Sequence, residues 1–133
     1  MSELPQALSQ FFSCVNARDT AGLGAVLTED VVYHLIVPYP PVRGRQAVVE
    51  ALRTSLYEAD RVDWEVRNWS ATGDPVFVER IDRFWFGDRE AAIECTGVFV
   101  LQEGLISEVR DYADLGTWRT RKNEALAGRR ISD

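Results

Sequence analysis

The sequence contains few of the residues that bind metals or form disulfides. It has one histidine, His34, and two cysteines, Cys14 and Cys95, which lie far apart in the chain. Zinc sites usually combine several histidine and cysteine ligands at short spacing. Two distant cysteines in such a chain are more simply interpreted as two buried thiols than as a disulfide. The sequence therefore predicts no metal, no disulfide and no cofactor.

Long hydrophobic runs and an excess of basic residues are also missing. No apolar run approaches the ~20 residues of a membrane-spanning helix, and Glu3 stands where a signal peptide needs a positive region. The net charge of −6 disfavours nucleic acid as a partner, because phosphate binding requires a basic face. We therefore expect a cytoplasmic protein that binds neither nucleic acids nor membranes.

The composition is that of a soluble globular protein. Of the 133 residues, 46% are hydrophobic and 27% are charged, which is typical of a folded domain and not of a disordered chain. This length is sufficient to bury a core of ordinary size. We therefore expect a single domain over residues 1–133.

The first half of the chain shows mainly helical periodicity. Apolar residues recur every three or four positions in three segments. Proline and glycine residues over 38–45 indicate a loop. We expect helices over 4–17 and 46–59, a short helix that starts after Asp19 and ends at Thr28–Asp30, and a strand over 31–37.

From residue 61 onward the pattern alternates with a period of two. Short turns rich in glycine and aspartate separate the alternating segments, as in an antiparallel meander. We expect strands over 64–71, 75–86, 91–102 and 105–112. Helices followed by a run of strands indicate an α+β fold. In it, the N-terminal helices pack on the concave face of a curved, mostly antiparallel sheet, and the open end of this cone forms a small-molecule pocket.

The strand over 75–86 places two charges in an apolar row. Alternate residues of a strand share one face, so Arg80 and Asp82 lie beside Val78 and Phe84. Burying either charge alone costs several kcal/mol or more. This face must therefore pair the two charges with each other and with a further group.

Asp111, on the last strand, is the candidate for that group. It shares a face with Leu105, Ser107 and Val109, which is the more apolar face of its strand. One guanidinium and two carboxylates that share a proton have no net charge, so the cluster is tolerable in a dry pocket. It contains one carboxylate and one carboxylic acid, which is the pair that a general base and a general acid require.

Two segments that carry these charges resemble a known enzyme family. ERID, residues 79–82, and TGVFVLQEGLISEVRDYADL, residues 96–115, are similar to the limonene-1,2-epoxide hydrolase family. That family is a branch of the NTF2-like, SnoaL-like cone-shaped α+β fold. VVYH, residues 31–34, and PPVRGR, residues 40–45, match the same layout, so the resemblance covers most of the chain.

The resemblance implies a role for four residues. Asp111 is the base that activates water, Asp82 is the acid that protonates the epoxide oxygen, and Arg80 bridges them. Tyr33 matches the tyrosine that helps to hold the water. The implied reaction adds water in one step to a small hydrophobic epoxide, terpene-like, cyclic or aryl, and yields a vicinal diol without a cofactor.

The segment after Tyr33 departs from the family pattern. Leu35 stands where the family has an asparagine that binds the water, and the segment to Pro40 is one residue longer. Because a slip of one residue exchanges the two faces of a strand, His34 is an alternative water-positioning residue. Loss of hydrolysis is a third possibility. We expect the substrate pocket to be lined by Phe84, Cys95, Val109, Leu35 and Tyr39.

Two other functions are compatible with the same residues. A ketosteroid-isomerase-like or polyketide-cyclase-like enzyme would use one aspartate as a carbon-acid base with Tyr33 as a donor. A non-catalytic binding module would place Arg80 and Asp82 in a plain salt bridge facing solvent or a partner. Under each hypothesis the outward residues Phe77, Ile81 and Trp85 favour a homodimer.

Overall fold

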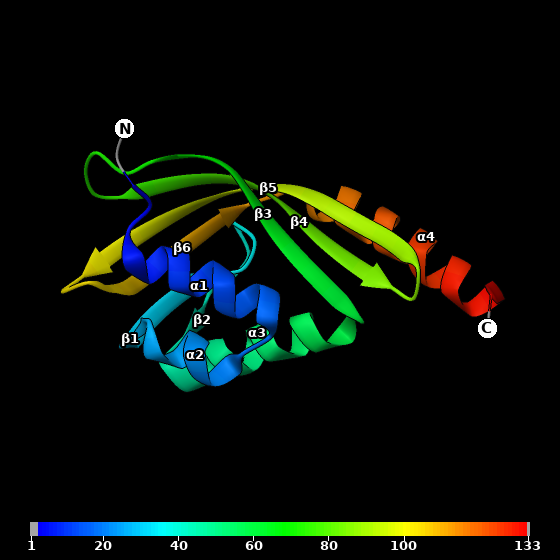
Figure 1. The fold of residues 1–133 in the computed structure, drawn as a ribbon, viewed down its shortest axis with the longest axis horizontal. Helices are drawn as coiled ribbons and strands as arrows, with labels where there is room; N and C mark the ends of the chain where they lie inside the picture. The colour runs from blue at the N-terminus through cyan, green and yellow to red at the C-terminus, as the bar shows by residue number, and fades with distance from the viewer. Residues whose placement is uncertain (1–2, 133) are drawn as a thin grey trace.

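The residues that the structure describes form a six-stranded mixed sheet and four helices (Figure 1). The structure, a computed structural model, describes residues 3–132, apart from the side chains of 129–132. The elements are α1 (Gln6–Ala17), α2 (Thr20–Ala25), β1 (Leu27–His34), β2 (Val42–Arg43), α3 (Arg45–Glu58), β3 (Arg61–Ser70), β4 (Val76–Phe86), β5 (Arg89–Gln102), β6 (Leu105–Tyr112) and α4 (Leu115–Ser132). The predicted α+β class, with N-terminal helices and a curved sheet, is confirmed.

The strand order in the sheet is β2-β1-β6-β5-β4-β3. β3 to β6 form the predicted antiparallel meander. β1 joins the other side of β6 as a parallel neighbour, in a register that places Tyr33 beside Val109. The first half of the chain thereby contributes a strand next to the one that carries Asp111.

The helices α1, α2 and α3 lie under the arch of the sheet (Figure 1). Their apolar faces form one core with the inward side chains of the strands. Phe11 of α1 is fully buried, and its ring lies 5.8 Å from that of Phe99 on β5. Leu52 and Leu56 of α3 are buried with them. This packing gives the sheet a covered concave side and an outer side.

The boundary between α2 and β1 differs from the prediction. The helix ends at Ala25, and the strand begins at Leu27 and continues through Thr28–Asp30, where the sequence had suggested a stop. The strand begins early because it pairs with β6. The Ile106 amide donates to the Val26 carbonyl at 2.8 Å, and Leu27 is the strand partner of Ile106. Tertiary contacts thus extend the strand into a polar segment.

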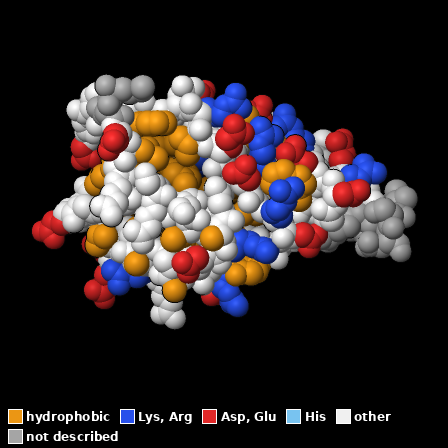
Figure 2. Space-filling view, in the orientation of Figure 1, with side chains coloured by type: hydrophobic (Ala, Val, Ile, Leu, Met, Phe, Trp, Pro, Cys, Tyr) orange, Lys and Arg blue, Asp and Glu red, His pale blue; other side chains and the backbone are white. Residues whose placement is uncertain are grey.

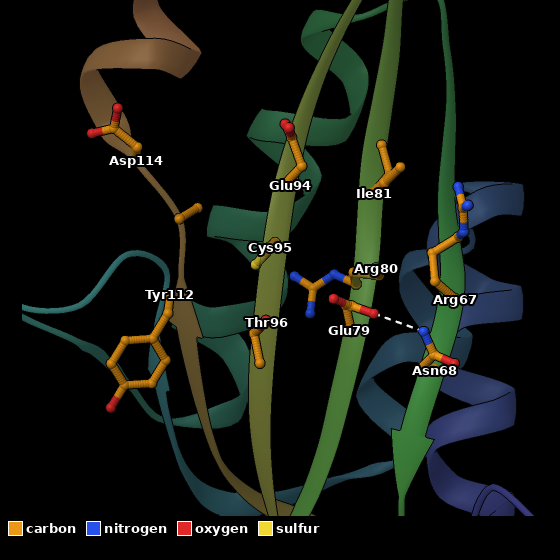
Figure 3. A pocket seen from close by; sticks show the side chains of 11 residues that line it. Arg67, Asn68, Glu79, Arg80, Ile81, Glu94, Cys95, Thr96, Tyr112 and Asp114 are labelled. Carbon is orange, nitrogen blue, oxygen red and sulfur yellow. Dashed lines mark hydrogen bonds between the residues drawn. The ribbon is translucent and has the colours of Figure 1, made fainter.

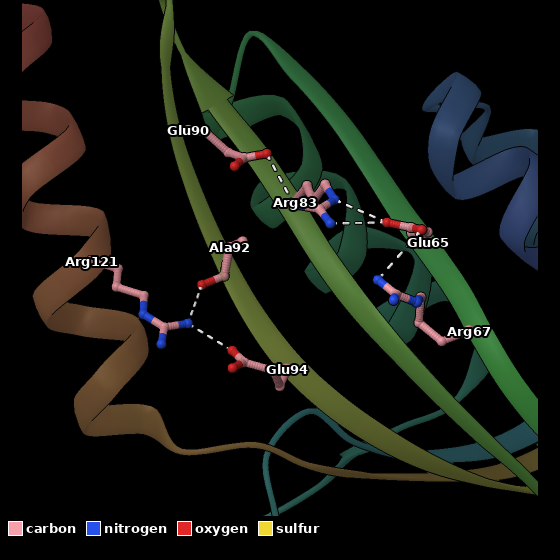
Figure 4. Close-up of polar contacts among 7 residues, drawn as sticks. All are labelled: Glu65, Arg67, Arg83, Glu90, Ala92, Glu94 and Arg121. Carbon is pink, nitrogen blue, oxygen red and sulfur yellow. Dashed lines mark hydrogen bonds and ion pairs between the residues drawn. The ribbon is translucent and has the colours of Figure 1, made fainter.

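The C-terminal helix α4 was not predicted from the sequence. β6 ends opposite Thr96, so among the described residues the segment 89–95 of β5 has no strand partner on that side. α4 runs along this edge, and Arg121 donates to the Ala92 carbonyl at 2.8 Å and to Glu94 at 2.7 Å (Figure 4). The helix covers a strand edge that would otherwise be available for pairing with another chain.

Because of a β-bulge, the inward row of β6 differs from the predicted row of Leu105, Ser107, Val109 and Asp111. The register shifts between Val100 and Leu101, and Ser107 is the extra residue on β6. As a result Ile106 is fully buried, while Leu105 and Ser107 are only half-buried. Val109 and Asp111, beyond the bulge, point inward as predicted.

The surface carries charged side chains of both signs (Figure 2). No helix among the described residues is long and apolar enough to cross a membrane. On the face shown in Figure 2, acidic and basic side chains are interspersed. Cys14 and Cys95 are both free and buried, as predicted.

Candidate active site

Arg80, Asp82 and Asp111 form one buried cluster on the inner side of the sheet. Arg80 Nε donates to Asp82 Oδ1 at 2.7 Å, and Nη2 donates to Asp82 Oδ2 at 3.2 Å. The same guanidinium donates from Nη1 to Asp111 Oδ1 at 3.1 Å and from Nη2 to Asp111 Oδ2 at 2.8 Å. One arginine therefore holds both carboxylates in a fork geometry that a lysine could not reproduce.

A glycine on the intervening strand makes this bridge possible. Gly97 of β5 pairs with Val78 of β4 on one side and with Asp111 of β6 on the other. A Cβ atom at this position would lie 2.7 Å from Arg80 Nη1 and 2.8 Å from Asp111 Oδ1. The guanidinium thus crosses β5 through space that any other residue would fill.

Tyr33 joins the cluster from β1. Its hydroxyl is buried and donates to Asp111 Oδ2 at 3.1 Å. Burial, and secondly the charge of Asp111, raise the pKa of Tyr33 well above its usual value. The phenol therefore stays protonated and acts as a donor that orients the Asp111 carboxylate.

Burial sets the protonation of Asp82. It raises the pKa of Asp82 to about 6, although Arg80 acts in the opposite direction; the charge of Asp111 adds to the increase. Burial would lower the pKa of Arg80, but Asp111 and Asp82 outweigh it and raise that pKa. The cluster thus combines a permanent cation with a carboxyl group that gains or loses its proton close to neutral pH.

The two oxygens of Asp111 differ in their remaining acceptor capacity. A carboxylate oxygen has two lone-pair sites. Oδ2 accepts from Arg80 Nη2 and from Tyr33, whereas Oδ1 accepts only from Arg80 Nη1 among the described residues. The acceptor site that is free for a further proton donor is therefore on Oδ1.

A small, largely apolar cavity of about 150 Å³ borders the two carboxylates. It lies on the concave side, between the sheet, α3, the start of α4 and the segment after β1. Its lining residues are Leu35, Ile36, Leu52, Ser55, Trp64, Asp82, Phe84, Ile93, Cys95, Asp111, Ala113 and Trp118. Burial raises the pKa of the Cys95 thiol, so that this side chain remains neutral.

The structure brings most of the expected site residues together. Leu35, Phe84 and Cys95 line the cavity beside Asp82 and Asp111. Val109 and Tyr39 are not among the described residues that line it, contrary to expectation. Val109 is fully buried in the core, and Tyr39 lies in the loop after β1 with 54% of its surface exposed.

His34 does not reach the cavity. Because Tyr33 faces inward, the next residue of β1 faces the other side of the sheet. There His34 Nε2 lies 3.8 Å from Glu108 Oε2, and about a quarter of the side chain is exposed. The register question is thus resolved in favour of Tyr33 as the inward residue.

Several lining residues were missed by the sequence analysis. Ile93 occupies the inward row two residues before Cys95, and Trp64 lies directly opposite Asp82 on the neighbouring strand. Both could have been found from strand alternation. Ser55 follows Leu52 on the same face of α3. Trp118 could not be found from strand alternation or helical spacing, because the helix that contains it was not predicted.

A larger hollow lies on the opposite face of the sheet. It is an open groove of about 760 Å³, and Figure 3 shows outward side chains such as Glu79, Ile81 and Thr96 along it. Asp82 and Asp111 do not line this groove. Of the cluster, only Arg80 lines this groove, whereas both carboxylates line the smaller inner cavity, which is therefore the candidate site for acid–base chemistry.

A comparison with known families assigns the protein to one of them. The model of the SnoaL-like domain matches residues 8–109, so the chain belongs to the SnoaL-like domain family. This agrees with the superfamily that the resemblance in the sequence implied.

Solved structures include an epoxide hydrolase among the similar folds. An LEH-like epoxide hydrolase from M. tuberculosis is 26% identical, with a TM-score of 0.75 and coverage of 97% of this chain and 96% of that one. SalBIII, an epoxide hydrolase/cyclase-like enzyme in pyran ring formation in the polyether salinomycin, is 24% identical over 84% of this chain and 91% of that one (TM-score 0.74).

A hypothetical protein from Catenulispora acidiphila DSM 44928 with a ketosteroid isomerase-like fold, solved with trimethylamine, is 14% identical. The match covers 91% of this chain and 95% of that one, with a TM-score of 0.79. At the identities of these last two proteins the likeness concerns the fold alone, and folds of this kind host many activities.

Proposed function

We propose that the protein is an epoxide hydrolase that adds water in one step to a small hydrophobic epoxide and releases a vicinal diol. The observation that carries the proposal is the Arg80 bridge, which holds Asp82 and Asp111 together at the wall of one apolar cavity. The raised pKa of Asp82, about 6, supports its role as the acid. Cyclic, aryl or terpene-like epoxides suit the apolar lining.

Asp111 is the general base in this proposal. Its Oδ1 atom retains an acceptor site, whereas Oδ2 is occupied by Arg80 and Tyr33. A water molecule that donates to Oδ1 therefore meets an oriented carboxylate. Tyr33, which is fully buried and donates a hydrogen bond to Asp111, acts as a positioning residue.

Asp82 is the general acid. Its Oδ1 atom accepts the shorter bond from Arg80 at 2.7 Å, and its Oδ2 atom the longer one at 3.2 Å. We assign the proton to Oδ2, since a proton there disturbs the weaker contact. A protonated Oδ2 donates to the epoxide oxygen, where negative charge develops as the ring opens.

The step balances without a covalent intermediate. The water oxygen forms a bond to one epoxide carbon while its proton passes to Asp111 Oδ1. The carbon–oxygen bond of that carbon breaks, and the released oxygen takes the proton of Asp82. The cluster keeps one proton and one negative carboxylate throughout, and exchange with solvent returns the proton to Asp82 for the next turnover.

Product analysis in labelled water tests the proposal directly. A panel of cyclic, terpene-like and aryl epoxides is incubated with the protein in H₂¹⁸O, and each diol is analysed by mass spectrometry. We expect one labelled oxygen per diol, including in a single turnover with excess protein, because the enzyme donates no oxygen atom. Isomerised carbonyl or allylic alcohol products would indicate an isomerase instead.

Asp111→Asn tests the assignment of the base. The amide cannot accept the water proton, so we expect kcat to fall by about 10³-fold or more, with an unchanged circular dichroism spectrum. Asp88→Asn, at an exposed turn between β4 and β5, is the matched control and should retain full activity. Turnover that persists in Asp111→Asn would exclude Asp111 as the base.

We also propose that the protein forms a homodimer through the outer face of the sheet. Phe77 and Tyr112 are 47% and 46% exposed on this face. The same face also carries ion pairs, including Arg83 with Glu65 at 3.0 Å (Figure 4). Exposed apolar side chains with a polar surround are typical of protein interfaces.

Light scattering coupled to size exclusion tests this proposal. We expect a mass of about twice 15.1 kDa. Phe77→Glu should shift the mass to that of a monomer, whereas Tyr39→Glu, at a somewhat more exposed site in the loop after β1, should not. A monomer at all concentrations of the wild-type protein would contradict the proposal.

A further inference from the structure

The indole of Trp64 is a buried hydrogen-bond donor without a partner. Trp64 is only 6% exposed and lines the cavity opposite Asp82. Its backbone amide donates to Asn16 Oδ1 at 2.7 Å, but Nε1 has no partner among the described residues. Indole can only donate, and an unsatisfied buried donor destabilises a protein. Trp64 Nε1 is therefore a buried donor that no described side chain or backbone group satisfies.

Ser55 provides a second available donor from another wall. It belongs to α3, a helix that lies beneath the sheet (Figure 1), and it lines the same cavity. Among the described residues its hydroxyl has no hydrogen-bond partner. The hydroxyl of the neighbouring Thr54, in contrast, donates to the Glu50 carbonyl at 3.0 Å and faces solvent. Ser55 is thus free to donate to a molecule in the cavity.

These two donors are additional to the groups that the reaction uses. The acid–base step employs Asp82 and Asp111, both held by Arg80. Apart from those carboxylates, the Cys95 thiol and the half-buried indole of Trp118, the other described side chains along the cavity are hydrocarbon groups. A hydrocarbon epoxide that fills the cavity would displace water and leave Trp64 Nε1 and Ser55 Oγ unpaired. Sites with buried polar groups discriminate strongly against ligands that cannot pair with them.

We propose that the cavity selects an epoxide that carries a second oxygen, as a carbonyl, hydroxyl or ether group, and that Trp64 Nε1 and Ser55 Oγ donate hydrogen bonds to it. The inference rests on the proposed hydrolase function for the epoxide itself. It narrows the substrate class from hydrocarbon epoxides to oxygenated ones. It also assigns specificity to two residues on β3 and α3 that take no part in the chemical step.

A pair of unreactive isosteres tests the donors independently of hydrolysis. 4-Methylcyclohexanone and 1-methyl-4-methylenecyclohexane differ only in an oxygen that replaces a methylene group. Their dissociation constants are measured by calorimetry. Hydrophobic burial alone favours the alkene, whereas we expect the ketone to bind about tenfold more tightly because it accepts hydrogen bonds. Equal or tighter binding of the alkene would overturn the inference.

Variants identify the residues responsible. Trp64→Phe keeps most of the ring packing and removes the N–H group, and Ser55→Ala removes the hydroxyl. Each variant should reduce the preference for the ketone, measured as the dissociation constant of the alkene divided by that of the ketone, by about 3- to 10-fold. Thr54→Ala, which removes a hydroxyl from the exposed side of the same helix, should leave the ratio unchanged. If Trp64→Phe does not fold, the Ser55→Ala variant still tests the inference. An unchanged ratio of the two dissociation constants in Ser55→Ala would overturn it.

A pair of epoxides separates this inference from the proposed function. Cyclohexene oxide and 3,4-epoxytetrahydropyran differ by one ring oxygen, and we expect a higher kcat/KM for the oxygenated epoxide. Hydrolysis of both with a preference for cyclohexene oxide would overturn the inference and leave the hydrolase function standing. Hydrolysis of neither, with the ketone preference retained, would overturn the hydrolase function while supporting the two donors.

Discussion

Gly97 leaves the space through which the Arg80 guanidinium reaches Asp111. A methyl group there would lie 2.7 Å from Arg80 Nη1 and 2.8 Å from Phe99 Cε1, both buried. Gly97→Ala must therefore displace the bridge or the core. We expect kcat/KM to fall by at least about 10²-fold, since misplaced catalytic groups lose activity steeply. We also expect a loss of about 1–3 kcal/mol in the free energy of unfolding.

The matched control for this change is Gly73→Ala, in the turn before β4, where a methyl group meets no atom within 4 Å. Both variants are compared by urea unfolding and by steady-state kinetics. Gly73→Ala should match the wild-type protein in both measurements. Full activity of Gly97→Ala would show that the bridge between β4 and β6 is not needed for catalysis.

The protonation of Asp82 predicts how activity depends on pH. Because burial raises its pKa to about 6, the acid form is abundant below that pH and is lost above it. We expect kcat/KM to decrease about tenfold per pH unit at pH values above 6. Initial rates between pH 5 and 8.5 measure this, with Asp111→Asn protein as the blank for spontaneous hydrolysis. A profile that is flat between pH 6 and 8 would contradict Asp82 as the acid.

The catalytic residues were predictable because their charge contradicts their surroundings. Arg80, Asp82 and Asp111 are conspicuous in rows of apolar residues. Strand alternation places Arg80 and Asp82 on one face, and the more apolar face of its own strand assigns Asp111 to the same interior. The same reasoning cannot find Gly97, whose role depends on two strands that flank it in space. Nor can it show which carboxyl group holds the proton, because burial depends on the complete packing.

At the scale of elements, the strands of the meander and their mutual pairing were predictable, whereas the pairing of β6 with β1 was not. β6 has the predicted bounds, and β4 and β5 differ by at most two residues. Strong alternation and short turns define such strands locally. β1 extends through polar residues because it pairs with β6, and a long-range contact of this kind leaves no local pattern.

The helix α4 illustrates the same limit at the C-terminus. Its sequence, LGTWRTRKNEALAGRRIS, contains few apolar residues and so gives only a weak helical stripe. Its position depends on the free edge of β5 and on Trp118, whose ring lies 4.8 Å from that of Phe84. Trp118 and Phe84 both line the cavity. The element that sequence analysis missed therefore closes one side of the candidate active site.

At the scale of the whole molecule, the buried cluster should reduce stability as pH rises. The pKa of Asp82 is 3.8 for an unperturbed group and about 6 in the folded protein. Below about pH 4 the carboxyl group is protonated in both the folded and the unfolded states. Above that pH the unfolded state loses the proton first, so the free energy of unfolding falls until the folded state also ionises above about pH 6.

Asp82→Asn isolates this contribution, because the amide cannot ionise while all other carboxyl groups titrate as before. The difference between these two pKa values of Asp82 corresponds to about 3 kcal/mol. We therefore expect the free energy of unfolding of Asp82→Asn, relative to the wild-type protein, to rise by about 2–3 kcal/mol between pH 4 and pH 7.5. Urea unfolding at half-unit pH intervals measures the difference. Parallel curves for the two proteins would mean that Asp82 ionises normally in the folded state, and the acid in the proposed mechanism would then have to be another group.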